Sequence, residues 1–450
     1  MLVQSESLQV MPGPRPVDSY LQFLRHYGPL WLDPLGEVGR RFERYGDIYR
    51  VVGRSGELLV ARDPAVAREV LLTQGTNFGK GHSAFARLRR VLGEGLLTSE
   101  GEVWRRQRSM LQPAFARTRL REYGAAMVSA ALKGVSELRG RTKVSVTELM
   151  TRITLRIVAQ TLFGETVEDA PRVTRAMSFL NQAFSRPELL PEGVPSPTRW
   201  RIERAVEDLD SAVFEMTERR LQQPRPGAED VLQRLLDLRD STGEGLDRRE
   251  IRDQLVTLYL AGHETTANTL SWTWYLLSHN REAFMKLRAE LQRVLGGRAP
   301  TLDDLPELPY LQQVVKEALR LYPPAFALPR GAKAATRVAG FDVPAGSEVV
   351  VWTYFVHRLP AYFPEPLRFA PERFTAEWER SLPKGAYLPF GAGQRACIGQ
   401  QFAMMEAQLV LGTLAQQVAL EMVSSRPVAA QIGATLRPVS ALSAQVHWLA

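Results

Sequence analysis

Residues 247–280 place the strongest limit on how this chain can fold. No proline occurs between residues 227 and 299, and inside that span the segment DRREIRDQLVTLYLAGHETTANTLSWTWYLLSHN is apolar on nearly every face in its second half. A helix that is hydrophobic all round is either a membrane span or the buried central helix of a large protein. His263, Glu264 and several threonines lie in its middle. The segment is therefore predicted to be a buried central helix.

The rest of the chain predicts a mainly α protein with a smaller β portion. Helical periodicity dominates from about Trp104 to Gln223 and again over 311–324 and 400–418. Short β-like runs bounded by turn residues occur at 46–53, 57–63 and 336–358. A proline-containing stretch near 187–198 predicts a loop. Because no repeat or linker interrupts the 450 residues, we expect an N-terminal lead-in over 1–20 and a single domain over 21–450.

Composition narrows the class of protein. The first twenty residues hold no apolar run long enough for a signal peptide or a membrane span, so we expect a soluble, cytoplasmic protein without a membrane anchor. A net charge of +8 is modest for this length; it indicates either a slightly basic surface or a basic patch for an acidic partner. We expect no nucleic-acid partner.

The one cysteine of the chain, Cys397, lies in the glycine-rich stretch FGAGQRACIG at 390–399, just before a predicted helix. Unpaired N–H groups at a helix start favour an anionic sulfur. A lone thiolate without His or Cys neighbours is a poor zinc site, which needs four ligands, but a good axial ligand for heme iron. In that reading Arg395 pairs with a heme propionate and Phe390 shields the sulfur. The alternative is an inert core cysteine in a helix-entry turn.

This stretch matches the heme-binding signature F-x-x-G-x-R-x-C-x-G of the cytochrome P450 family at every specified position. The resemblance implies the cytochrome P450 fold, with a long central helix over heme b and Cys397 thiolate as the proximal iron ligand. It runs from about residue 30 to 440. Within AGHETT at 261–266, Ala261, Glu264 and Thr265 resemble the family's distal-helix motif.

The resemblance implies that this motif on the central helix delivers protons to oxygen at the heme. The small Ala261 leaves room for dioxygen above the iron. Glu264 and Thr265, an acid and a hydroxyl in an otherwise apolar helix, can open the backbone hydrogen bonds locally and deliver protons. The alternatives are a cap-like polar cluster or a solvated helix face, and the apolar flanking residues argue against the solvated face.

Three further matches follow the family's order. Trp104 and Arg108, four residues apart on one helical face, resemble its W-x-x-x-R pair that holds heme propionates, and Arg330 resembles another propionate partner. Glu317 and Arg320 resemble the E-x-x-R pair, which the resemblance joins to Arg373 of PERF in a buried charge network. That network is expected to brace the loop that holds Cys397.

The implied activity is a monooxygenase that inserts one oxygen atom from O2 into an apolar molecule by hydroxylation or epoxidation. By position, Tyr259, Phe326, Leu328 and Ile432 form an apolar substrate pocket that suits fatty-acid, terpenoid or polyketide-like substrates. Electrons are expected from a ferredoxin or flavodoxin with its NAD(P)H reductase, because the sequence ends without an appended reductase. Arg105, Arg106 and Lys384 are candidates for that docking face.

Two other functions stay open at this stage. A peroxide-dependent peroxygenase or an isomerase needs no electron supply, although such enzymes often lack the acid–hydroxyl pair of Glu264 and Thr265. A non-catalytic heme sensor usually carries an output domain, and no segment remains for one.

Overall fold

The computed structural model describes residues 11–14, 28–30, 32–53, 56–80, 83–164, 171–184, 196–224, 230–239, 243–424 and 426–449. The chain divides into two compact units. Unit 1 comprises Met1–Ala86, Ala325–Pro366 and Arg380–Ala396, and unit 2 comprises Arg87–Pro324, Leu367–Glu379 and Cys397–Ala450. The expectation of a single domain over 21–450 stays a prediction.

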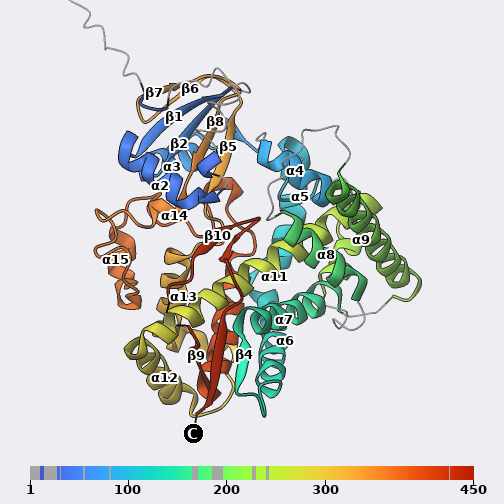
Figure 1. Cartoon of the computed structure of the whole chain (residues 1–450). Helices are drawn as coiled ribbons and strands as arrows, with labels where there is room; N and C mark the ends of the chain where they lie inside the picture. Colours follow the sequence, from blue (N-terminus) through green and yellow to red (C-terminus); the bar gives the residue numbers. More distant parts are fainter. Residues whose placement is uncertain are drawn as a thin grey trace, which may run out of the picture. The chain divides into compact units, whose positions relative to one another are not determined.

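Unit 1 is built on a five-stranded sheet with the order β1-β2-β8-β5-β3, and Figure 1 labels β1, β2, β8 and β5. These strands are β1 (Ile48–Gly53), β2 (Gly56–Ala61), β8 (Glu348–Val351), β5 (Leu328–Ala332) and β3 (Phe78–Gly79). β2 and β8 pair in parallel, and the other neighbours pair antiparallel. Unit 1 also contains the hairpin of β6 (Thr336–Val338) and β7 (Phe341–Val343) and the helices α2 (Pro34–Tyr45), α3 (Pro64–Arg68) and α14 (Thr353–Val356).

The described part of the lead-in is packed rather than free. The Arg50 N–H of β1 donates to the Pro12 carbonyl at 2.8 Å. A Cβ at Gly13 would lie 1.9 Å from the Arg50 carbonyl oxygen, so only glycine permits this approach. Met11 packs against the sheet's hydrophobic cluster. Residues 11–14 therefore extend the structure of unit 1.

Unit 2 is mainly helical, which confirms the mainly α architecture predicted from the sequence. Its helices are α5 (Gly101–Leu111), α6 (Arg117–Ser136), α7 (Val146–Val158), α8 (Pro171–Phe184), α9 (Pro197–Gln222), α10 (Val231–Asp237), α11 (Arg248–His279), α12 (Arg281–Leu295), α13 (Pro309–Leu321) and α16 (Gln400–Gln417). Two helices cross the division between the units: α4 (Ser83–Leu92) and α15 (Ala376–Ser381). β4 (Lys143–Ser145), β12 (Ser443–Trp448) and β9 (Val418–Met422) form a small sheet, and β10 (Ala430–Ile432) pairs with β11 (Leu436–Pro438).

α11 is the buried central helix predicted for 247–280, and it runs through unit 2 in Figure 1. It begins at a capping box in which Asp247 accepts from the Glu250 N–H and Glu250 accepts from the Asp247 N–H. Trp272 and Trp274 are fully buried, and Trp272 stacks on Tyr322 with ring centroids 3.8 Å apart. None of the helices described is both long and apolar enough to cross a membrane.

Two local expectations need correction. The loop expected near 187–198 lies outside the described residues except for its last three, and there Pro197 already begins α9 with Ser196 before it. Strand β5 was not expected, because its sequence LPRGA contains a proline. Pro329 nevertheless pairs with Val350 of β8.

Candidate functional site

Glycines shape the backbone that leads into Cys397. Gly391 and Gly393 have φ values of 68° and 71°, in the left-handed region that glycine adopts without strain. At Gly393 a Cβ would lie 1.9 Å from the Leu71 carbonyl oxygen, whereas at Gly391 it would meet no atom of the described chain within 4 Å. Gly393 is therefore required for close approach as well as for conformation.

Cys397 lies three residues before Gln400, the first residue of α16. Gly399 is the N-cap and supplies no side-chain cap, so the first N–H groups of α16 keep their partial positive charge near the sulfur. The Cys397 side chain is exposed. This is the environment that favours a thiolate over a thiol.

The structure brings Arg108 of α5 close to Cys397 within unit 2. Burial lowers the pKa of Arg108, and the negative charge of the Cys397 sulfur opposes that shift. Trp104, one turn earlier on α5, is buried in the main hydrophobic cluster of unit 2, and Ile398 packs against the same cluster. Arg108 and Cys397 thus come together although they lie far apart in the sequence, while the contact of Trp104 and Arg108 with heme propionates stays a prediction.

The donor set at Cys397 fits heme. Across the described chain, no group of three or more His, Cys, Asp and Glu side chains gathers at a metal-binding distance. A metal bound by Cys397 therefore needs most of its ligands from elsewhere, which a porphyrin provides. The neighbouring Arg108 guanidinium suits the carboxylates of such a group.

Ala261, Glu264 and Thr265 lie together on α11. The Thr265 hydroxyl donates to the Ala261 carbonyl at 2.7 Å. The helix is nevertheless α-helical without interruption from Arg248 to His279, so the local opening of backbone hydrogen bonds expected here is not present. Packing explains part of this regularity, because Gly262 faces Val158 of α7, where a Cβ would stand 3.2 Å from the valine side chain.

Glu264 is held by residues that sequence reasoning missed. The Thr435 hydroxyl, in the turn between β10 and β11, donates to Glu264 Oε1 at 2.9 Å. The Asn268 side-chain amide donates to Thr435 Oγ1 at 2.8 Å. Burial raises the pKa of Glu264, and the Thr435 hydrogen bond and the charge of Arg437 partly oppose that rise. Asn268, four residues after Glu264 on the same helix face, was the available signal.

His263, next to Glu264, has a packing role. Its Nδ1 lies 3.1 Å from the Tyr259 carbonyl, and because a carbonyl only accepts, Nδ1 carries the hydrogen. Burial lowers the pKa of His263 to about 4, which keeps the ring neutral.

Comparison with known proteins decides the family. The cytochrome P450 family model matches residues 12–440. The chain is a cytochrome P450. It is 34% identical over 403 residues to "Cyclooctat-9-en-7-ol 5-monooxygenase" of Streptomyces melanosporofaciens, covering 88% of this chain and 86% of that relative. It is 33% identical over 379 residues to "Pentalenene oxygenase" of Streptomyces avermitilis, covering 83% and 84%.

A solved structure supports the same assignment. The crystal structure of the cytochrome P450DA heme domain superposes with a TM-score of 0.87 at 27% identity, covering 98% of this chain and 97% of that one. The protein therefore has the cytochrome P450 fold and heme b as its cofactor, and it is a cytochrome P450 monooxygenase.

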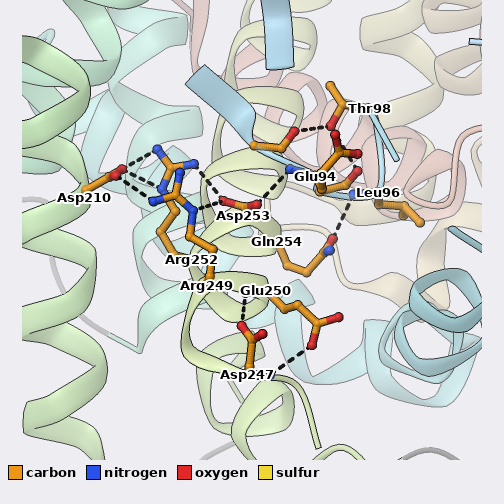
Figure 2. Close-up of polar contacts among 12 residues, drawn as sticks. Glu94, Leu96, Thr98, Asp210, Asp247, Arg249, Glu250, Arg252, Asp253 and Gln254 are labelled. Carbon is orange, nitrogen blue, oxygen red and sulfur yellow. Dashed lines mark hydrogen bonds and ion pairs between the residues drawn. The ribbon is translucent and has the colours of Figure 1, made fainter. Parts of the chain in front are cut away.

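A second network in this P450 fixes the loop that precedes α5. Figure 2 shows Asp253 accepting from the Glu94 N–H at 2.8 Å and Gln254 accepting from the Leu96 N–H at 3.0 Å. Arg252, almost fully buried, donates to Asp253 and to Asp210 of α9 (Figure 2). The loop at 93–97 is thus tied to α11 through its backbone.

The charge network predicted from E-x-x-R and PERF is present in unit 2. Arg320 donates to Glu317 through Nε at 2.6 Å and Nη2 at 2.8 Å, and Arg373 Nε donates to Glu317 Oε1 at 3.0 Å. Glu317 and Arg320 are fully buried. The Ala370 N–H also donates to Glu317 at 3.0 Å. The network joins α13 to residues 368–373, while its bracing of the Cys397 loop stays a prediction.

The remaining predicted heme residues lie in unit 1. Arg330 is buried within β5, where its Nη1 donates to the Pro329 carbonyl at 2.8 Å. Phe390 and Arg395 are half-buried in the glycine-rich stretch. Leu388, two residues before Phe390, donates its N–H to His357 Nε2 at 2.8 Å, so a buried histidine fixes this segment. The heme contacts of Arg330, Phe390 and Arg395 stay predictions.

The predicted pocket residues differ in their surroundings. Tyr259 is buried, with its ring 5.9 Å from that of Phe163 and 5.3 Å from that of His263. Ile432 ends β10 and is half-buried. In unit 1, Phe326 lies 5.7 Å from Trp352 and Leu328 pairs with Val351. The packed position of Tyr259 favours a core role, and its place in a substrate pocket stays a prediction.

Two charged positions were read incompletely from the sequence. Arg106, a candidate for the docking face, donates to Glu250 at 2.7 Å and to the Gly245 carbonyl at 2.8 Å, so it secures the start of α11. Glu406 of α16 was not singled out, yet it is fully buried. Burial raises the pKa of Glu406 well above its usual value, and Thr266 of α11 opposes this only in part.

Proposed function

We propose that this P450 inserts one oxygen atom from O2 into an apolar, terpenoid-like molecule. The observation that carries the substrate class is the similarity to two Streptomyces relatives named for cyclooctat-9-en-7-ol and pentalenene. Phe326, Leu328 and Ile432 are compatible with such a substrate, because apolar side chains line most pockets for apolar ligands. Electrons would come from a separate ferredoxin- or flavodoxin-type donor with its NAD(P)H reductase.

The residues of the site would each have a separate role in binding the heme. Heme b, when bound, supplies the activation of dioxygen. Cys397 would be its axial thiolate, stabilised by the N-terminus of α16 and by Arg108. Trp104, Arg108, Arg330 and Arg395 would hold the propionates. Phe390 would shield the sulfur, and the small side chain of Ala261 would leave room for O2.

Glu264 and Thr265 would control protons. Because its pKa is raised, the Glu264 carboxyl keeps its proton to higher pH than an ordinary glutamate does. Thr265 Oγ1 follows directly on the same helix, and its hydroxyl bonds to the Ala261 carbonyl. A proton held at Glu264 could thus pass through Thr265 or ordered water toward the reacting oxygen.

The substrate class can be tested with the heme-loaded enzyme. Pentalenene and a linear fatty acid are titrated separately, and the low-spin to high-spin change of the heme spectrum is recorded. The proposal expects the change with pentalenene at lower concentration than with the fatty acid. A response to the fatty acid alone would contradict the terpenoid assignment.

The electron source is tested separately. Product is compared after turnover with NAD(P)H, ferredoxin and ferredoxin reductase and after turnover with hydrogen peroxide. Activity with peroxide alone would favour the peroxygenase alternative. Cys397→Ser must abolish the red-shifted Soret band of the reduced, CO-bound protein, because serine does not supply a thiolate; an unchanged band would refute Cys397 ligation.

A further inference from the structure

The hydrogen bonds around Glu264 distinguish its two carboxyl oxygens. Thr435 has one hydroxyl hydrogen, and that hydrogen is donated to Glu264 Oε1 at 2.9 Å. The Asn268 amide nitrogen can only donate, and it occupies a lone pair of Thr435 Oγ1 at 2.8 Å. Asn268 therefore turns the Thr435 hydrogen toward Glu264.

Oε2, the other oxygen of Glu264, is in a different situation. It is buried and has no hydrogen-bond partner within the described chain. Since Oε1 already accepts a hydrogen bond, a proton taken up by this carboxyl binds at Oε2. Burial favours that neutral form.

Thr435 is itself fixed to the body of unit 2. The next residue, Leu436, is fully buried, and its N–H donates to the Pro324 carbonyl at 3.0 Å. Thr435 also lies three residues after Ile432 in the same hairpin, β10–β11. The hydroxyl that holds Glu264 is thus carried by a firmly anchored turn.

We propose that Thr435, oriented by Asn268, is a positioning residue that fixes the Glu264 side chain and assigns its exchangeable proton to Oε2. The proposal rests on the proposed role of Glu264 in proton delivery. It adds a residue far away in the sequence that sets both the direction and the protonation state of that acid.

The test measures the protonated carboxyl band of the holoenzyme by infrared spectroscopy as a function of pH. Subtracting the Glu264→Gln spectrum identifies the Glu264 band, and subtracting the Glu406→Gln spectrum identifies that of the other buried acid. Thr435→Val removes the hydroxyl at nearly constant size and is expected to shift the Glu264 band to higher frequency. It also moves the titration midpoint of that band to higher pH, because the lost hydrogen bond stabilised the charged form.

Two variants serve as controls. Thr435→Ser keeps the hydroxyl and is expected to restore the wild-type band and midpoint. Thr413→Val removes another buried threonine hydroxyl, which donates to the Leu409 carbonyl at 2.7 Å, and is expected to leave the Glu264 band unchanged. A Glu264 band unaffected by Thr435→Val, or one that responds equally to Thr413→Val, would overturn the proposal.

A separate measurement tests the proposed role of Glu264 in proton delivery. If Glu264→Gln leaves NADPH oxidation in the ferredoxin system and its solvent isotope effect unchanged, Glu264 has no part in proton delivery. The infrared comparison still decides whether Thr435 positions the carboxyl. If Glu264→Gln changes the isotope effect and Thr435→Val changes neither this effect nor the band, only the positioning role is refuted.

Discussion

Replacing Glu317 by glutamine should destabilise this P450 far more than the loss of an ordinary ion pair. The carboxylate accepts from Arg320 Nε at 2.6 Å, from Arg373 Nε at 3.0 Å and from the Ala370 N–H at 3.0 Å. Glu317→Gln keeps the size of the side chain but turns one acceptor into a donor facing a buried guanidinium. Removing one partner of a buried pair costs about 3–5 kcal/mol, because the other charge stays uncompensated.

A matched control is the ion pair between Lys316, on the same helix, and Glu379 of α15. Lys316 donates to Glu379 at 2.6 Å, and the two side chains are 20% and 30% exposed, against 0% for both Glu317 and Arg320. Glu379→Gln breaks an ion pair that solvent screens, so it should cost less than about 1 kcal/mol. Both substitutions replace one carboxylate oxygen by an amide nitrogen, so the difference between them compares a buried network with a solvent-screened pair.

Urea unfolding followed by circular dichroism measures both effects. At an unchanged m-value, Glu317→Gln should lower the unfolding free energy by at least about 3 kcal/mol, roughly a hundredfold in the unfolding equilibrium constant. Equal midpoints for Glu317→Gln and Glu379→Gln would refute the reasoning, because they would show that Arg320 finds water or another acceptor without cost.

Two further predictions follow from the site. Gly393→Ala should reduce the heme content and the thiolate-type CO spectrum sharply, because its Cβ would overlap the Leu71 carbonyl; Gly391→Ala, at a similar φ but with open space, should cost only about 1 kcal/mol. Equal losses in the two variants would contradict the close approach at Gly393. The wild type should be more stable than His263→Gln at pH 6.5, and this difference in unfolding free energy should shrink as the pH falls to about 4. The buried histidine of the folded wild type resists protonation, while the same residue in the unfolded chain takes up the proton. A gap that does not change with pH in urea unfolding would contradict the burial of His263.

Much of the site could be predicted because its residues belong to local patterns. Glu317 and Arg320 lie three residues apart and share one helix turn. The glycines around 391 and 393 mark backbone that other residues resist. Where the chemistry is encoded within one turn of chain, the sequence is sufficient to locate it.

The parts that could not be predicted depend on contacts between distant segments. Thr435 and Glu264 are 171 residues apart, and the pairing requires the β10–β11 hairpin to lie against α11. Asp253 accepts from the Glu94 N–H, 159 residues away in the sequence, and a backbone N–H cannot be recognised from the type of residue that carries it. β5 was missed because Pro329 lowers its strand propensity, while pairing with both β8 and β3 overrides that preference.

The His263 prediction must be measured as a difference in unfolding free energy between the wild type and His263→Gln, because other buried acids also contribute to the pH dependence of stability. A folded-state pKa near 4 for His263 means that the unfolded chain binds more protons between about pH 4 and 6.5, so this residue makes stability rise with pH there. The fall of the His263 pKa from 6.5 to about 4 corresponds to roughly 3 kcal/mol. Glu264 and Glu406 have raised folded-state pKa values, so they bind protons more readily when folded and make stability fall as pH rises above 4.5. The three contributions oppose one another in the same window, and a flat wild-type profile would therefore not show that His263 is exposed. Only the wild-type curve minus the His263→Gln curve isolates the histidine, and a difference that fails to grow from pH 4 to pH 6.5 would refute its burial as a neutral ring.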